Sequence, residues 1–139
     1  MTRSEFDRKY TSQLNPQQLA AVHAVDGAVL LLAVPGSGKT TVLVTRLGYM
    51  LYCCGISPDA ILTMTYTKAA TKEMQKRFVR FFGQDCPQIP EIRTINGVSS
   101  KIIDSYTRTH GSGSAFTVVE NEGELAKIVS DLYRELSGE

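Results

Sequence analysis

The sequence predicts an α/β domain with a mostly parallel sheet. Short apolar runs alternate with amphipathic stretches along the chain, a rhythm typical of strands that alternate with helices. One run, 28–34, is apolar throughout, leads into a Gly-rich turn and is followed by a helical pattern. Because strands buried on both faces of a parallel sheet are continuously apolar, we expect residues 28–34 to form the central strand.

The other elements each have a local signal. Helix 14–25 starts with Asn15 as N-cap, Pro16 at the first helical position and Gln18 three residues after the cap, the pattern of a capping box. The remaining predicted elements, in order, are a helix over 41–51, a strand over 61–66, a helix over 68–82, a strand over 91–94, a helix from there to 106, a flexible break at 111–114, an extended piece over 116–119 and an amphipathic helix over 122–136. Residues 1–13 read as a polar leader.

Composition narrows the class of protein. The 139 residues carry 15 Lys and Arg against 14 Asp and Glu, so the net charge of +1 indicates neither a nucleic-acid partner nor an acidic one. The longest apolar run, 28–34, is far shorter than the roughly 20 residues of a membrane helix. The first ten residues lack an apolar stretch of the secretory kind, so we expect a cytoplasmic protein without a membrane partner. Cys53, Cys54 and Cys86 have no metal-ligand spacing, which favours free thiols.

The strongest chemical signal is the segment 33–40, AVPGSGKT, which joins the predicted central strand to a helix. Backbone N–H groups of such a turn and the helix N-terminus point at one place and bind phosphate. Lys39 supplies positive charge, and Thr40 supplies a hydroxyl for Mg²⁺. The general pattern has Gly where this chain has Ala33. The alternative interpretation is a Gly-rich turn with an incidental lysine.

A phosphate site hydrolyses ATP only with further groups, above all a second Mg²⁺ ligand at the end of another strand. No Asp stands where such a ligand would: the candidates Asp26, Asp59, Asp104 and Asp131 do not follow a four-residue apolar strand. The chain therefore contains half of an ATPase site, and either the chain is a fragment or a partner completes the site.

Positive charge concentrates in the predicted helix 68–82. Four basic residues recur there at every fourth position: Lys68, Lys72, Lys76 and Arg80. This spacing places them in one row, and Arg77 adds to the charge while Glu73 opposes it. Such a row is either a solvated helix face or a nucleic-acid contact.

Four segments in the same order resemble the N-terminal part of the UvrD/Rep/PcrA family of superfamily 1 DNA helicases. They are LNPQQ at 14–18, AVPGSGKT at 33–40, TYTKAATKEM at 65–74 and TING at 94–97. In that family they correspond to the Q motif and to motifs I, Ia and Ib. The match is collinear and covers nearly the whole chain.

The resemblance implies a RecA-like P-loop fold of three layers, with 14–110 as part of subdomain 1A and 111–139 as a linker and the start of subdomain 1B. It implies ATP and Mg²⁺ as cofactors, and single-stranded DNA and duplex junctions as partners. The complete enzyme would use ATP for 3′ to 5′ translocation and unwinding. Motif II, the rest of 1B, and subdomains 2A and 2B would lie beyond residue 139, so the isolated chain should not turn over ATP. The alternatives are the helicase half of an AddA- or RecB-type helicase-nuclease, and a small P-loop phosphotransferase.

The resemblance also implies the site residues. Those for the nucleotide are Gln18, Pro35, Gly36, Ser37, Gly38, Lys39, Thr40 and Thr41, of which Lys39 and Thr40 are catalytic and Thr40 binds the metal. Those for DNA are Thr65, Tyr66, Thr67, Lys68, Thr94 and Asn96.

Several of these roles have competing interpretations. Gln18 either reads adenine with its amide or only closes the capping box. Tyr66 is either a base-stacking platform or a core aromatic, and Asn96 either contacts phosphate or N-caps the next helix. The family often has Arg at the position of Thr41 and His and Ser at the positions of Asn96 and Gly97, so we expect weaker contacts there.

Overall fold

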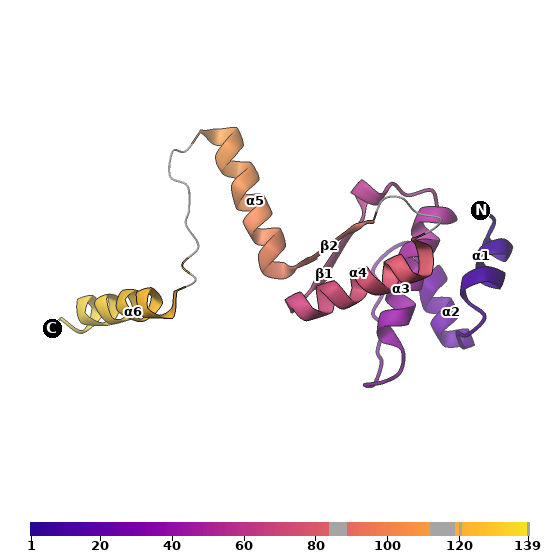
Figure 1. Cartoon of the computed structure of the whole chain (residues 1–139), viewed down its shortest axis with the longest axis horizontal. Coiled ribbons are helices and arrows are strands. Elements are labelled where there is room, and N and C mark those ends of the chain that lie inside the picture. The colour runs from indigo at the N-terminus through magenta and orange to yellow at the C-terminus, as the bar shows by residue number, and fades with distance from the viewer. Residues whose placement is uncertain (84–88, 112–118, 120, 139) are drawn as a thin grey trace. The chain divides into compact units, whose positions relative to one another are not determined.

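The computed structural model describes residues 1–83, 89–111, 119 and 121–138 (Figure 1). Its elements are α1 (Arg3–Tyr10), α2 (Pro16–His23), α3 (Lys39–Tyr52), the 3₁₀ turn η1 (Pro58–Ala60), β1 (Leu62–Thr65), α4 (Lys68–Phe82), β2 (Glu91–Thr94), α5 (Ile95–His110) and α6 (Glu122–Ser137). They divide into two compact units, Met1–Ser100 and Lys101–Glu139. Cys86 and most of the predicted break and extended piece between 111 and 119 fall outside the described residues.

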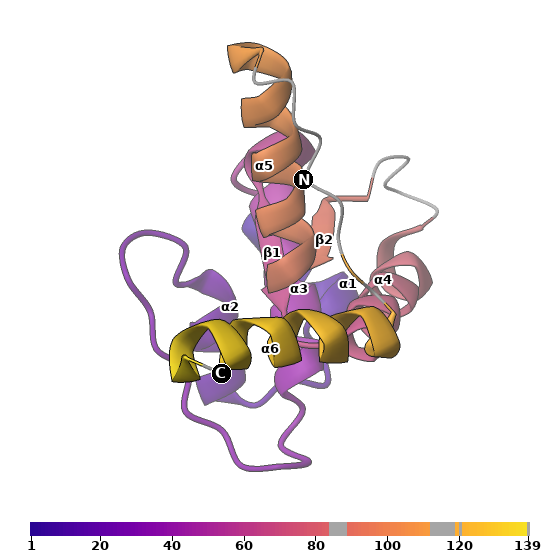
Figure 2. The ribbon, with the colours of Figure 1, turned by 90° about the vertical axis from the view of Figure 1, so that its left-hand side faces the viewer.

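The first unit contains a two-stranded parallel sheet. β1 pairs with β2 in the register that runs from Leu62 opposite Glu91 to Thr65 opposite Thr94, and the two strands lie side by side in Figures 1 and 2. α4 connects the strands and packs against both. The crossover helix lets the strands run in the same direction, since a tight hairpin would make them antiparallel. The predictions of strands near 61–66 and over 91–94, and of a helix over 68–82, are confirmed.

The predicted central strand over 28–34 is wrong for the part of the chain that the structure describes. Residues 27–34 form no strand, and the side chains of Leu30 and Leu32 are each 83% exposed. A strand exists only where a second strand accepts its backbone hydrogen bonds, and β1 and β2 pair with each other instead. The apolar pattern predicted a buried strand, but residues 28–34 are exposed, because no neighbouring strand among the described residues pairs with them.

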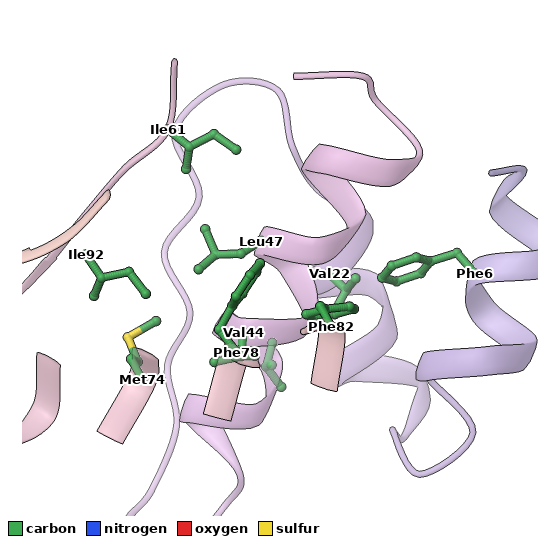
Figure 3. Packing of buried hydrophobic residues seen from close by; sticks show 10 residues of the cluster. Phe6, Val22, Val44, Leu47, Ile61, Met74, Phe78, Phe82 and Ile92 are labelled. Carbon is green, nitrogen blue, oxygen red and sulfur yellow. The ribbon is translucent and has the colours of Figure 1, made fainter. Parts of the chain in front are cut away.

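The core of the first unit lies between α1, α2, α3, α4 and the strands (Figure 3). Phe78 and Phe82 of α4 are buried and their rings meet at 5.1 Å between centroids. Phe6 of α1 is fully buried and lies 6.3 Å from the Phe82 ring. The sequence analysis assigned no helix to residues 1–13, yet α1 forms there behind a capping box of Thr2 and Glu5, and Phe6 fixes it to the core.

The second unit holds the rest of α5 and the whole of α6. α5 continues to His110, beyond the predicted end at 106. The prediction of a helix over 122–136 is confirmed by α6, whose N-cap Asn121 accepts hydrogen bonds from the N–H groups of Gly123 and Glu124. No helix among the described residues is long and apolar enough to cross a membrane.

Candidate nucleotide and DNA site

The Gly-rich turn of residues 35–38 opens directly into α3. Gly36 and Gly38 have φ of 79° and 80°, values at which a side chain would be strained. Gly38 is the N-cap of α3 and makes no side-chain cap bond, so the cap itself contributes no group that would compete for the first-turn N–H groups. A Cβ at Gly38 would also lie 3.3 Å from Nε2 of Gln18. Left-handed residues are typical of turns whose successive N–H groups form an anion-binding concavity.

Two side chains of the segment, those of Ser37 and Lys39, donate hydrogen bonds to its own backbone carbonyl groups. The Lys39 ammonium donates to the carbonyl oxygen of Val34 at 2.9 Å and to that of Ala33 at 3.3 Å. The Ser37 hydroxyl donates to the same Val34 carbonyl at 2.7 Å. These bonds hold the positive charge of Lys39 over the turn, while its side chain stays exposed. A phosphate group in the turn would exchange carbonyl partners of the ammonium for charged oxygens, which form stronger bonds.

Both ends of the Gln18 carboxamide are engaged. Its Oε1 accepts from the Asn15 N–H at 2.9 Å, and the Gln18 N–H donates to Asn15 Oδ1 at 2.9 Å, so the predicted capping box is confirmed. Its Nε2 donates to the Ser37 carbonyl at 2.9 Å. This second bond ties α2 to the phosphate turn across 19 positions of sequence, and nothing in the spacing predicted it. Reading adenine would require Gln18 to exchange these bonds.

A pocket of about 460 Å³ lies beside the turn and brings predicted nucleotide residues together. Its lining includes Gln18, Ser37 and Lys39 with the apolar Leu31, Val34 and Val42. Polar groups at one side of an apolar wall are the usual arrangement of a small-ligand site. Pro35, Gly36, Gly38, Thr40 and Thr41 do not line this pocket, and Thr41 instead faces α4.

Thr40 is the residue of the turn that was predicted to bind the metal. Thr40 is half-buried in the first turn of α3, directly after Lys39. Among the described residues, no three His, Cys, Asp or Glu side chains gather where they could hold a metal ion. Thr40 could contribute one hydroxyl to Mg²⁺, and the other ligands would be phosphate oxygens, water or groups from elsewhere.

The predicted DNA residues meet at one edge of the sheet. Because β1 and β2 are parallel and Thr65 lies opposite Thr94, the segments that follow each strand leave from the same edge. A groove of about 550 Å³ there is lined by both Lys68 and Thr94. Lys68 and Thr94, which belong to two different motifs and lie 26 positions apart in sequence, thereby share one surface.

The hydroxyl groups of Thr65, Thr67 and Thr94 make local hydrogen bonds in the segments that leave this edge. Thr65 Oγ1 lies 2.6 Å from Thr71 Oγ1, and Thr67 Oγ1 accepts from the Ala70 N–H as N-cap of α4. Thr94 Oγ1 accepts from the Gly97 N–H at 3.0 Å at the start of α5. The interpretation of Asn96 as an N-cap is therefore wrong, because α5 already begins at Ile95 and Thr94 caps it.

Three other side chains at this edge point to solvent. Tyr66 is 91% exposed, so it is not the core aromatic that the sequence left open. Lys68 and Asn96 are exposed as well. An exposed aromatic ring beside a lysine offers a stacking surface and a phosphate contact together.

The basic row of α4 does not follow a single face. A step of four residues advances about 40° around an α-helix, so three steps turn the row by about 120°. Lys68 and Lys72 line the groove with β2, whereas Lys76 and Arg80 line a separate groove of about 760 Å³ with Lys9 and Tyr10 of α1. Only the first half of the row lies at the edge that carries Tyr66.

Most of the chain matches one known protein family. Residues 14–137 match the family described as the UvrD/REP helicase N-terminal domain. The chain belongs to this family. The match begins at the residue before the Asn15 cap and includes the phosphate turn, both strands and α6.

Individual relatives of this UvrD/REP family member are named as DNA helicases. A probable DNA helicase II homologue of Mycoplasma capricolum is 34% identical over 86% of this chain and 16% of its own length. The ATP-dependent DNA helicase PcrA of Bacillus subtilis is 33% identical over 84% of this chain and 16% of its own. The ATP-dependent DNA helicase Rep of Buchnera aphidicola is 27% identical over 87% and 18%. The chain thus spans about a sixth of the length of the relatives that it matches.

Proposed function

We propose that this chain forms the part of an ATP-dependent DNA helicase that binds the nucleotide phosphates and one stretch of single-stranded DNA. The observation that carries the nucleotide half is the phosphate turn, in which Gly36 and Gly38 adopt positive φ directly before Lys39 and α3. The DNA half rests on the shared edge of β1 and β2, where Tyr66 and Lys68 lie exposed.

In this proposal the residues of the turn bind and orient the nucleotide. First-turn N–H groups of α3 and the Lys39 ammonium hold phosphate oxygens, and the Thr40 hydroxyl holds Mg²⁺, which when bound neutralises phosphate charge. Gln18 reads the adenine from α2. The carboxylate that completes the metal site and the residue that orients water come from outside this chain, so the chain alone binds ATP and does not turn it over.

The proposed fold is RecA-like, with more strands than the two that the described residues form. The extended segment 28–34 exposes Leu30 and Leu32 in the described part of the chain, and it is apolar enough to be buried on both faces. We propose that strands from the remainder of a longer polypeptide pair with it and complete a mostly parallel sheet. In the complete enzyme, ATP use drives 3′ to 5′ movement on single-stranded DNA and unwinding at duplex junctions.

Nucleotide titration of the chain and of two lysine variants tests this function. Lys39→Ala removes a charge-assisted bond to phosphate, which is worth about 1.5–3 kcal/mol, so the affinity for ATP with Mg²⁺ should fall by roughly 10- to 100-fold. Lys76→Ala removes an equal charge from an exposed position on α4 and should leave nucleotide affinity unchanged.

Two further measurements accompany the titration. Phosphate release from ATP should stay at the level of the buffer, with or without single-stranded DNA. Circular dichroism should show the same helix content in all three proteins, since Lys39 is exposed. Equal nucleotide affinity of the wild type and Lys39→Ala would contradict the proposal.

A further inference from the structure

One arginine side chain connects the helix of the phosphate turn to the helix of the DNA edge. Arg77 of α4 donates through Nη1 to Thr41 Oγ1 at 3.2 Å, across 36 positions of sequence. Through Nη2 it donates to Glu73 Oε1 at 2.7 Å, one turn earlier on its own helix. Thr41 lies in the first turn of α3, two residues after Lys39.

The Arg77 guanidinium is partly buried and makes two hydrogen bonds. Its side chain is 34% exposed, less than that of Glu73 at 55%. A guanidinium is planar and its donors point in fixed directions, so the bond to Glu73 orients the donor that reaches Thr41. On the same helix, Met74 and Phe78 are buried in the core that α3 shares, which keeps the two helices at a constant separation.

Each of the two helices that this connection joins begins beside one of the proposed ligand sites. α3 begins at the phosphate turn, and α4 begins at Lys68 directly after Tyr66. A displacement of α4 along its axis would move Arg77 relative to Thr41 and so disturb the first turn of α3. Apolar packing alone fixes this axial position weakly, because Met and Phe side chains adapt to small shifts, whereas a hydrogen bond has a preferred length and direction.

We propose that Glu73, Arg77 and Thr41 form a link that couples nucleotide binding at the phosphate turn to DNA binding at the sheet edge. This inference rests on the proposed function, since it names how the two halves of that site communicate. Arg77 acts here as a positioning residue, because it contacts Thr41 rather than either ligand. The link makes each ligand change the affinity of the other by the same factor, as thermodynamic linkage requires.

The experiment measures that factor directly on the 139-residue chain. The Kd of a fluorescent oligothymidylate is determined with and without a saturating, non-hydrolysable ATP analogue and Mg²⁺, and the Kd of the analogue is determined with and without the oligonucleotide. Couplings between sites are typically about 5- to 150-fold. We expect a factor in this range for the wild type, and a factor within about twofold of one for both Arg77→Met and Thr41→Val.

Three variants test whether a lost coupling comes from this link and not from misfolding or lost charge. Thr41→Val keeps the shape of the side chain and removes only the hydroxyl, so it tests the link even if Arg77→Met fails to fold. The combined variant should show no loss beyond that of either single change, because both remove one interaction. Arg80→Met removes a charge from an exposed position one turn further along α4 and should retain the wild-type factor.

The outcomes separate the two proposals. A wild-type chain that binds neither ligand contradicts the proposed function itself. A wild-type chain that binds both ligands independently overturns the link alone, and so does a coupling factor that stays unchanged in both Thr41→Val and Arg77→Met. Loss of coupling with little change in the affinity for either ligand alone supports the link. A merely structural role would weaken the binding of each ligand and leave the coupling factor, the ratio of its Kd values without and with the other ligand, unchanged.

Discussion

The ring of Phe82 on α4 lies directly against the backbone of Gly48 on α3, with no side chain of α3 between them. A Cβ added at Gly48 would stand 2.6 Å from Cε1 and 2.7 Å from Cε2 of the ring. Gly48 and Phe82 are both buried, and the ring has little room to move because it also meets Phe78 and Tyr10. The close approach of the two helices therefore depends on this glycine.

Gly48→Ala should destabilise the chain even though alanine favours helices. Overpacking of this kind costs about 1–3 kcal/mol, more than the helix propensity of alanine returns. Urea unfolding monitored by circular dichroism measures the change in the free energy of unfolding. In a Phe82→Leu background the same substitution should cost much less, since the smaller side chain leaves space. An equal cost in both backgrounds would show that the Phe82 ring is not the obstacle.

Gln18→Ala should change both stability and nucleotide preference. It removes the back-bond of the capping box and the bond to Ser37, so we expect a loss of about 1 kcal/mol in urea unfolding. If Gln18 reads adenine, the wild type prefers ATP over GTP and the variant binds the two alike. Asn15→Ala is the matched control, because it removes the cap and keeps the carboxamide. An unchanged preference in Gln18→Ala would leave Gln18 with the capping role alone.

Lys68→Ala and Tyr66→Ala should weaken DNA binding in different ways. Loss of the Lys68 charge lowers the slope of log affinity against log salt by about 0.7, the value for one phosphate contact on a single strand. Loss of the Tyr66 ring costs about 1–3 kcal/mol for a stacked base and leaves the slope unchanged. Titrations of oligothymidylate at several salt concentrations distinguish the two effects.

Lys76→Ala is the control for this DNA experiment. Lys76 lies two turns further along α4 and lines the other groove, with α1. Its loss should change neither slope nor affinity by as much as that of Lys68. If all three variants bound DNA as the wild type does, the DNA half of the proposed function would be refuted.

Cys53 should react with iodoacetamide more slowly than its neighbour Cys54. Burial raises the pKa of the Cys53 thiol, and its Sγ lies 3.8 Å from the Thr2 carbonyl, whereas Cys54 is exposed. A raised pKa means less thiolate at any given pH, and the thiolate is the form that reacts. The rate for Cys53 should therefore still rise with pH where an ordinary thiol has levelled off. Peptide mass spectrometry after timed alkylation measures both sites, and equal rates in the folded chain would contradict this expectation.

The elements that depend on near neighbours in sequence were predictable. The α4 helix over 68–82 and the β2 strand over 91–94 have the expected bounds, because their apolar spacing and capping residues act within a few positions. The Asn15 and Gln18 capping box is local in the same sense. The unusual backbone conformation of the phosphate turn was predictable too, because positive φ strongly favours glycine and the turn has glycine at 36 and 38.

Tertiary structure decided whatever needs a partner distant in sequence. Residues 28–34 are apolar enough for a central strand, but strand formation requires a second backbone, and the described strands pair with each other. Helix geometry gives the turn of about 120° in the basic row, but only the packed structure shows that its first half lines a groove with β2 and its second half a groove with α1. The bonds from Gln18 to Ser37 and from Arg77 to Thr41 span 19 and 36 positions, so only the packing of α2 and α4 against α3 brings those atoms together. Sequence by itself therefore determined which chemical groups are present and their local conformation. Packing determined which of these groups meet, because a hydrogen bond depends on distance in space and not on distance along the chain.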